Sequence, residues 1–333
     1  MQIRSENWGI PDGVHLFAGT KYQENDDLRY GYERNVRGKS TITQDAKKLI
    51  YHITENDETV AFLPGFIIRK GPIKIFASPF EGWNTPYMGP LLRECVKVNN
   101  FLMSVRSRLK KDKFHYAQFT LSNIDQNLIR ACGFQILEGN TYIARIADDP
   151  ETVLSGYSKS TRKHVRRAIN NGLAVEFTKD KSFIDIYYEQ LCQVFDKSNM
   201  RPTYPKAKVE ALWDCLMPSE KLLATQVSYD NAIIATRLDF FDGVYMHSFG
   251  SASDQNYLHL YPNELARYHV MSFAADNGIK YYDMTGGGSY KEKFGGEKTT
   301  ITTLVYDPYG LLWFKEVAKK VYRLKFKFRR SKL

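Results

Sequence analysis

Three β-strand patterns joined by two-residue turns constrain the fold of this chain more than any other feature. They occupy residues 222–229, 232–241 and 243–249. Asp230-Asn231 lies between the first two, and Asp242-Gly243 leads into the third. Such pairs favour tight β-hairpin turns because their residues tolerate a positive φ. We therefore predict an antiparallel three-stranded meander in the second half of the chain.

A long helix and a further strand should follow the meander. Pro262 suits the first position of the helix, and Asn277-Gly278 suits its end. Residues 279–284 then form a strand that runs into three glycines. Upstream of the meander we predict helices 159–171, 184–195 and 206–215, and strand 174–178. The first of these helices has a basic face, and its Val165, Ala168 and Ile169 should face a core.

The first half shows a shorter version of the same order. A turn at Lys70-Gly71-Pro72 joins two strand patterns. The predicted elements are strands 59–68, 73–77, 116–121 and 141–146, and helices 91–109 and 126–132. Asp148-Asp149-Pro150 interrupts these patterns. We predict a first domain over residues 1–149, a second over 150–310, and a C-terminal helix over 311–333 that joins the first domain.

Composition limits the possible classes of protein. A chain of 333 residues with 43% hydrophobic residues can build two folded domains. No stretch approaches the roughly 18 apolar residues of a membrane span, and the N-terminus lacks a signal-peptide core, so we expect a cytoplasmic protein. The four cysteines stand far apart, without the spacing of a zinc site, so we expect no bound metal.

The net charge of +10 is concentrated at the C-terminal end. Residues 315–333 hold nine Lys or Arg and one Glu, which accounts for +8. Apolar residues recur there at helical spacing, which predicts an amphipathic helix with a cationic face. Three interpretations stay open. The helix could fold back on the first domain, hold tRNA phosphates, or lie on an anionic membrane at the inner face of the cell.

The second half contains a glycine turn followed by a lysine. Gly286-Gly287-Gly288 ends the strand 279–284, and Lys291 comes three residues later. Glycines let the backbone approach a ligand and offer N–H groups to an anion, and a lysine adds a cation. The glycines alone fit a flexible turn equally well. A nucleotide P-loop is disfavoured because its GxxxxGK[ST] order is missing.

Residues 290–296, Tyr-Lys-Glu-Lys-Phe-Gly-Gly, resemble the F-K-x-x-F-G-G signature of the Fem aminoacyltransferases and their GNAT-like relatives. Tyr290 replaces the leading Phe. Residues 160–173 are similar to the family's S-x-x-x-R-x-x-I-R-x-A-x-x-x-G-L helix, and residues 263–283 to its long helix closing on G-x-x-x-Y-D. The resemblance covers residues 158–296. It implies an α/β (α+β) fold of tandem GNAT-like domains, with mixed, mostly antiparallel sheets flanked by helices.

The resemblance also implies a reaction. The family's enzymes take an amino acid from aminoacyl-tRNA and pass it to an amine of a peptidoglycan or other envelope precursor, which is nucleotide- or lipid-linked, without a cofactor. Lys291 occupies the position of the lysine implicated in transfer, with Phe294 and Gly295 in the same motif. Arg201 and Tyr204 look like the family's pair that contacts the acceptor phosphate.

Transfer from an activated ester needs little machinery, chiefly orientation of the amine and stabilisation of an oxyanion. Lys291 could donate to that oxyanion or bind a phosphate. Asp283 could accept a proton or position the amine, and could equally cap a turn. His247 could act as a base near neutral pH, with Tyr245 on the same face, although a histidine on a strand is more often a packed side chain.

One departure concerns the acyl donor. The Q/R-x-x-G-x-G/A loop that ordinary GNAT enzymes use for the pyrophosphate of coenzyme A is missing. This weakens an alternative in which acyl-CoA or an acyl carrier protein acylates an amino sugar of a surface polysaccharide. A third possibility is a non-catalytic protein that binds tRNA or membrane and has kept the fold.

Overall fold

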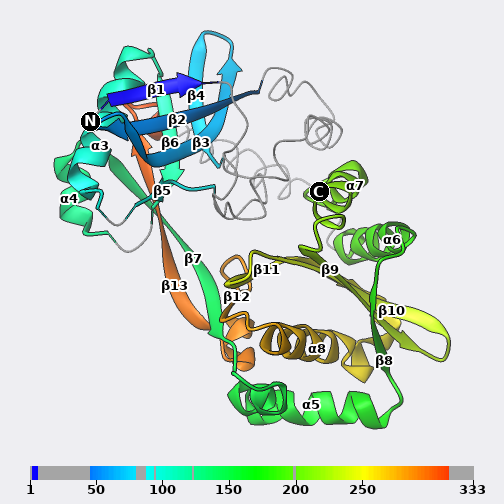
Figure 1. Cartoon of the computed structure of the whole chain (residues 1–333). Coiled ribbons are helices and arrows are strands. Elements are labelled where there is room, and N and C mark those ends of the chain that lie inside the picture. Colours follow the sequence, from blue (N-terminus) through cyan, green and yellow to red (C-terminus); the bar gives the residue numbers. More distant parts are fainter. Residues whose placement is uncertain are drawn as a thin grey trace, which may run out of the picture.

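The computed structural model describes residues 2–6, 46–79, 88–93, 95–121, 124–197 and 200–314 (Figure 1). Its strands form one thirteen-stranded sheet in the order β1-β2-β3-β4-β6-β13-β7-β12-β11-β10-β9-β8, with β5 beside β3. The strands are β1 Gln2–Glu6, β2 Lys47–Glu55, β3 Glu58–Lys70, β4 Ile73–Ser78, β5 Leu91–Leu92, β6 Tyr116–Thr120, β7 Gln135–Arg145, β8 Ala174–Thr178, β9 Leu222–Tyr229, β10 Ala232–Phe241, β11 Tyr245–Ser253, β12 Tyr281–Asp283 and β13 Glu297–Tyr306.

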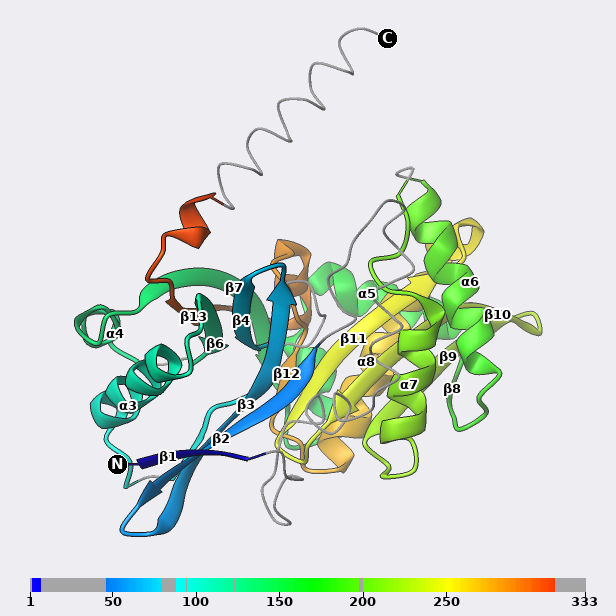
Figure 2. The ribbon, with the colours of Figure 1, turned by 90° about the horizontal axis from the view of Figure 1, so that it is seen from above.

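Helices cover both faces of the sheet in the second half of the chain. Figure 2 shows α6 and α7 on one face of strands β9–β11 and α8 on the other. The helices are α3 Val98–Lys111, α4 Gln126–Ala131, α5 Lys159–Asn170, α6 Phe183–Asp196, α7 Lys206–Leu216 and α8 Pro262–Asp276, with the 3-10 helices η1 Pro150–Gly156, η2 Gln255–Leu260 and η3 Ser289–Phe294. No helix in the described ranges is long and apolar enough to cross a membrane.

The sheet is mixed and mostly antiparallel, as predicted. Strands β9, β10 and β11 form the expected meander, and Asp230 and Asn231 both have positive φ at the first turn. Among the described strands, the parallel pairs are β4–β6 and β11–β12. The parallel contact between β11 and β12 extends over only three residue pairs, 245–247 with 281–283. Beyond it, the two strands separate where the glycine turn begins.

Two long strands connect the halves of the molecule. Strand β13 pairs with β7 along 297–305 and with β6 along 303–306. The far end of β7 pairs with β12. Strand β13 belongs to the second half of the sequence but lies between β6 and β7 of the first half. One sheet therefore includes strands from both sides of the predicted boundary at residue 149. The domain limits stay a prediction.

Hydrophobic clusters on each face of the sheet account for most predicted elements. One contains α8, η1 and α5, a second contains α6 and α7, and a third surrounds α3 and α4 in the first half. Helix α5 begins where the Ser158 hydroxyl accepts a hydrogen bond from the Thr161 N–H, and Gly172 ends it with φ +80°. Helix α8 begins at Pro262, and Gly278 follows it with φ +68°.

Two expectations were wrong. The helix predicted over 91–109 starts at Val98, because Leu91 and Leu92 pair with Ala61 and Phe62 of β3 as the short strand β5. Ile169, expected to face a core, is 49% exposed. Thr161, Val165 and Ala168 form a narrow buried stripe on α5, and Ile169 lies about 100° around the helix from Ala168, beyond its edge.

Candidate active site

The buried side chain of Lys291 is hydrogen-bonded to the backbone of the glycine turn. Strand β12 ends at Asp283, and the chain turns through Thr285 and Gly286, both with positive φ, into η3. Lys291 is only 5% exposed. Its Nζ donates to the carbonyl oxygen of Thr285 and, at 2.7 Å, to that of Gly286. An ammonium has three N–H groups, so one is left for a ligand at this turn.

The surroundings of Lys291 favour its neutral form more than water does. Burial lowers the pKa of Lys291 to about 8; Arg267 lowers it too, Asp283 acts in the opposite direction, and Arg237 lowers it again. A group near its pKa at neutral pH can give up or take a proton readily. Lys291 is therefore mostly charged at neutral pH, but much less strongly so than an exposed lysine.

Asp283 and His247 are neighbours on the parallel strands β12 and β11. Both side chains are about 1% exposed, and His247 Nδ1 lies 3.8 Å from Asp283 Oδ2. Asp283 Oδ1 accepts hydrogen bonds from the Thr141 hydroxyl and, at 2.8 Å, from the Thr285 N–H. Asp283 thus caps the glycine turn while it faces the histidine. At 3.8 Å the carboxylate acts on the imidazole through its charge, which favours a protonated imidazole.

Aromatic rings enclose His247. The ring of Phe240 stacks on it at 5.2 Å, and Tyr245 lies at 6.0 Å with nearly parallel planes. Tyr245 itself stacks on Tyr281 at 4.9 Å, and burial raises the pKa of its phenol. These contacts describe a packed histidine beside a carboxylate. The catalytic roles of His247 and Asp283 stay predictions.

Arg201 and Tyr204 differ in their surroundings. Arg201 is exposed, whereas Tyr204 is 6% exposed and its hydroxyl is hydrogen-bonded to that of Tyr187. Burial raises the pKa of Tyr204 to about 12. A Cβ on Gly250 would lie 2.3 Å from the Tyr187 hydroxyl oxygen and 2.8 Å from that of Tyr204, so only glycine fits beside this pair. Because the Tyr204 phenol is already bonded, Arg201 is the better placed of the two for a phosphate.

Phe294 and Gly295 attach η3 to the domain. Phe294 is 3% exposed, and its ring packs on Tyr157 at 5.3 Å. Gly295 has φ +79°, and an added Cβ would lie 3.0 Å from the Gly156 carbonyl oxygen. These two residues of the motif therefore position Lys291. In the turn itself, Gly286 and Gly287 are exposed and Gly288 is half-buried, so their backbone can meet a ligand.

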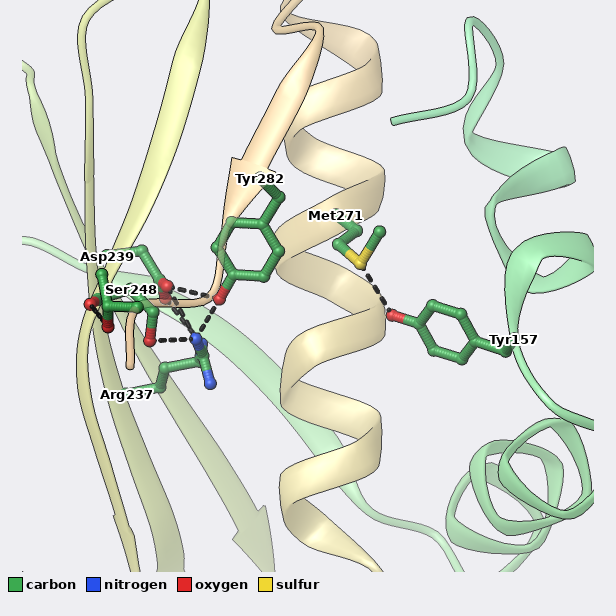
Figure 3. Close-up of polar contacts among 7 residues, drawn as sticks. Tyr157, Arg237, Asp239, Ser248, Met271 and Tyr282 are labelled. Carbon is green, nitrogen blue, oxygen red and sulfur yellow. Dashed lines mark hydrogen bonds and ion pairs between the residues drawn. The ribbon is translucent and has the colours of Figure 1, made fainter. Parts of the chain in front are cut away.

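Sequence reasoning missed a buried polar network beneath the turn (Figure 3). Arg237 and Asp239 form an ion pair at 2.7 Å, and Asp239 also accepts from the Tyr282 hydroxyl at 2.7 Å. Arg237 donates to the Ser248 hydroxyl at 2.7 Å and to Tyr282. This network joins β10, β11 and β12 just before the parallel strands separate. Two opposite charges at positions i and i+2 of an apolar strand were the available signal.

A third buried cation, after Lys291 and Arg237, lies near the turn. Arg267 of α8 is 5% exposed, and its guanidinium lies 4.4 Å from the centre of the Phe294 ring. Its Nε and Nη1 have no hydrogen-bond partner among the described residues. Burying an arginine away from a carboxylate is costly. Arg267 adds a positive potential near Lys291, which suits a site where negative charge develops.

Side chains of the protein itself occupy the space at the N-terminus of α8, and we call this a closed N-terminus. Pro262 has no N–H at the start of the helix. Glu264, in the first turn, accepts from Lys293 at 2.8 Å and lies 3.9 Å from His164 Nδ1. The His164 ring stacks on Tyr261 at 4.0 Å. A carboxylate thus lies in the first turn of the helix, whose start would otherwise attract an anion.

Residues 159–293 match the family model described as an acetyltransferase (GNAT) domain. The match covers 135 of the 333 residues. The protein is therefore an acyltransferase, and the domain supports N-acyl transfer as its reaction. It contains Lys291, Asp283, His247 and the closed start of α8.

Solved structures show the same fold over most of the chain. FemX is similar with a TM-score of 0.63 at 13% identity, over 91% of this chain and 97% of that one. A conserved protein of unknown function from Bacteroides thetaiotaomicron has a TM-score of 0.56 at 12% identity, over 86% and 90%. L-PGS from Bacillus licheniformis has a TM-score of 0.50 at 11% identity, over 83% and 88%. No curated protein matches the sequence. The predicted fold class is confirmed.

Proposed function

We propose that the protein is an aminoacyltransferase that takes an amino acid from aminoacyl-tRNA and transfers it to an amine of a cell-envelope precursor in the cytoplasm. The signature at residues 290–296 supports the proposal, because its lysine lies in the glycine turn with one N–H to spare. The likeness of the whole fold to FemX is consistent with it. No further cofactor is required, since the ester of aminoacyl-tRNA is already activated.

The closed N-terminus of α8 is the observation that carries the choice of donor. Ordinary GNAT enzymes hold the pyrophosphate of coenzyme A with a glycine-rich loop before this helix. Here the 3-10 helix η2, Tyr261 and Pro262 replace that loop, and the Glu264 carboxylate lies in the first turn. A pyrophosphate there would have to displace the Glu264–Lys293 ion pair and would lack an N–H at Pro262. This disfavours coenzyme A as the donor.

The reaction assigns a role to each group at the turn. The amine of the acceptor attacks the ester carbonyl, a C–N bond forms, and the carbonyl oxygen becomes an oxyanion. Lys291 donates its remaining N–H to that oxyanion, and Arg267 adds positive potential. His247, beside Asp283, is the candidate acceptor of the proton that the amine loses. The C–O bond then breaks, and the ribose hydroxyl of the tRNA leaves with a proton.

A transfer assay with radiolabelled amino acids on total tRNA tests the proposal. We expect incorporation into an envelope-precursor extract that ribonuclease abolishes and that is lost in Lys291→Met. The neighbouring Lys293→Met is the matched control, since Lys293 bonds Glu264 and not the turn. Labelled product that forms equally after ribonuclease treatment would refute aminoacyl-tRNA as the donor.

A second candidate is an N-acyltransferase that uses acyl-CoA or an acyl carrier protein on an amino sugar of a surface polysaccharide. The description of the matched domain as an acetyltransferase favours it. It predicts that an acyl-CoA stabilises the protein against heat. It also predicts that coenzyme A, which has the pyrophosphate but no acyl group, stabilises it less. Stabilisation by acyl-CoA together with no transfer from tRNA would establish this alternative.

A further inference from the structure

Three large aromatic side chains within six residues are exposed near the end of the described chain. Tyr309, Trp313 and Phe314 are 63%, 64% and 60% exposed, more than any other large apolar side chain of the described residues. The rings of Trp313 and Phe314 contact each other edge to face at 4.9 Å. We call these three residues the aromatic patch. Isolated exposed aromatics are ordinary, but three within six residues mark a surface that meets an apolar partner.

The local structure explains why the patch points outward. Leu311 and Leu312 pack on the first half of the molecule, against a cluster that includes Ile68 and Tyr116. The Asp307 carboxylate accepts hydrogen bonds from the N–H groups of both leucines at 2.8 Å. With the two leucines turned inward, Trp313 and Phe314 are presented to solvent. Their orientation therefore follows from packing that anchors the segment.

Basic residues lie on the side of the patch that Tyr309 contacts. The Tyr309 ring lies on His115 at 5.4 Å, and His115 is bonded to the Lys74 backbone. Lys74 pairs with Arg69 across the β3–β4 hairpin, and Arg69 is exposed. Lys70 is exposed in the same hairpin. Lys113 is exposed too, and lies two residues before His115 in the sequence. Residues 315–333, outside the described part, continue the chain with nine Lys or Arg and one Glu.

We propose that the aromatic patch docks the protein on the surface of an anionic lipid bilayer. Tryptophan and tyrosine favour the boundary between lipid headgroups and acyl chains, where one end of the ring is apolar and the other wet. Each nearby cation adds about 1 kcal/mol of attraction to anionic lipid. Trp313 and Phe314 pack on each other, so they form one apolar surface and not separate platforms for the bases of an RNA.

The position of the patch suits an enzyme with a lipid-linked acceptor. Strand β13 begins just after η3, and Asp307 follows its other end. A ten-residue strand spans roughly 30 Å. The patch therefore lies about that far from the glycine turn. A protein docked there keeps the glycine turn within about that distance of the membrane surface.

Vesicle co-sedimentation of the full chain tests this docking without any acyl donor. We expect binding to vesicles that contain phosphatidylglycerol, weak binding to vesicles of phosphatidylcholine alone, and a blue shift of tryptophan emission on binding. The double variant Trp313→Ala/Phe314→Ala should lose at least about tenfold in partitioning. Ile169→Ala/Phe177→Ala is the matched control, because these side chains are 49% and 40% exposed on the GNAT domain. It should bind like the wild type.

Three results would overturn the inference. The first is equal partitioning of the Trp313→Ala/Phe314→Ala variant and the wild type. The second is tRNA binding that depends on these two residues, with no binding to anionic vesicles. The third is a dimer, seen by light scattering, that the double variant dissociates. A negative transfer assay does not bear on this inference, since vesicle binding is measured without transfer.

Discussion

Replacing Lys291 with methionine separates its catalytic from its structural contribution. The side chain keeps its length, but the turn loses two hydrogen bonds to the carbonyls of Thr285 and Gly286. A hydrogen bond of a charged group contributes about 1.5–3 kcal/mol, so the two together contribute about 3–6 kcal/mol. The pKa of about 8 shows that burying the ammonium is costly. After allowance for the part that meets water, that cost is roughly 2 kcal/mol. The two terms oppose each other, so we expect the free energy of unfolding to fall by about 1–4 kcal/mol.

The transfer rate should respond far more strongly. Loss of one donor to a developing oxyanion slows acyl transfer by about 10²–10³-fold. Single-turnover transfer and denaturant unfolding of the same variant measure the two effects separately. Lys293→Met, on the same 3-10 helix, removes a part-buried ion pair to Glu264 and a contact with the Phe294 ring. It leaves the Thr285 and Gly286 carbonyls bonded to Lys291, and should leave the rate within about threefold. A Lys291→Met enzyme that stays within about tenfold of the wild-type rate would refute the role of Lys291 as the donor.

Two further predictions concern buried charge. Asp239→Asn leaves the Arg237 guanidinium buried without its carboxylate. Denaturant titration should therefore show that the free energy of unfolding falls by about 3–5 kcal/mol. Asp148→Asn, in the exposed pair with Lys280, is the control and should lower it by less than about 1 kcal/mol. The pKa of Lys291 is about 8 in the folded protein, against an ordinary 10.5. Between these two pH values the unfolded chain therefore binds more protons than the folded protein. The contribution of Lys291 to the free energy of unfolding thus rises with pH over this range. The unfolding free energy of the wild type minus that of Lys291→Met should therefore increase from about pH 8 to about pH 10; a constant difference would contradict the shifted pKa.

The site could be predicted only where its residues follow one another in the chain. Lys291, Phe294 and Gly295 belong to one recognisable motif, and Asp283 ends the strand before it. The sequence also indicated that His247 lies on a strand. That it faces Asp283 depends on the parallel pairing of β11 with β12, which no local pattern specifies. The contacts of Arg237 with β11 and β12, and of Tyr204 with α6, were missed for the same reason, because these partners come from other elements.

By itself the sequence determined most helices, strands and turns, because these follow from local periodicity and from glycine, proline and asparagine at the ends of elements. Asp230-Asn231, Gly172 and Gly278 each mark a boundary that the backbone adopts. Only the tertiary structure decided that Leu91–Leu92 is a strand, that β13 lies between β6 and β7, and that Glu264 closes the start of α8. Each of these depends on hydrogen bonds or charges between residues about thirty or more positions apart in sequence, and the energy of such a contact exists only once the chain has folded.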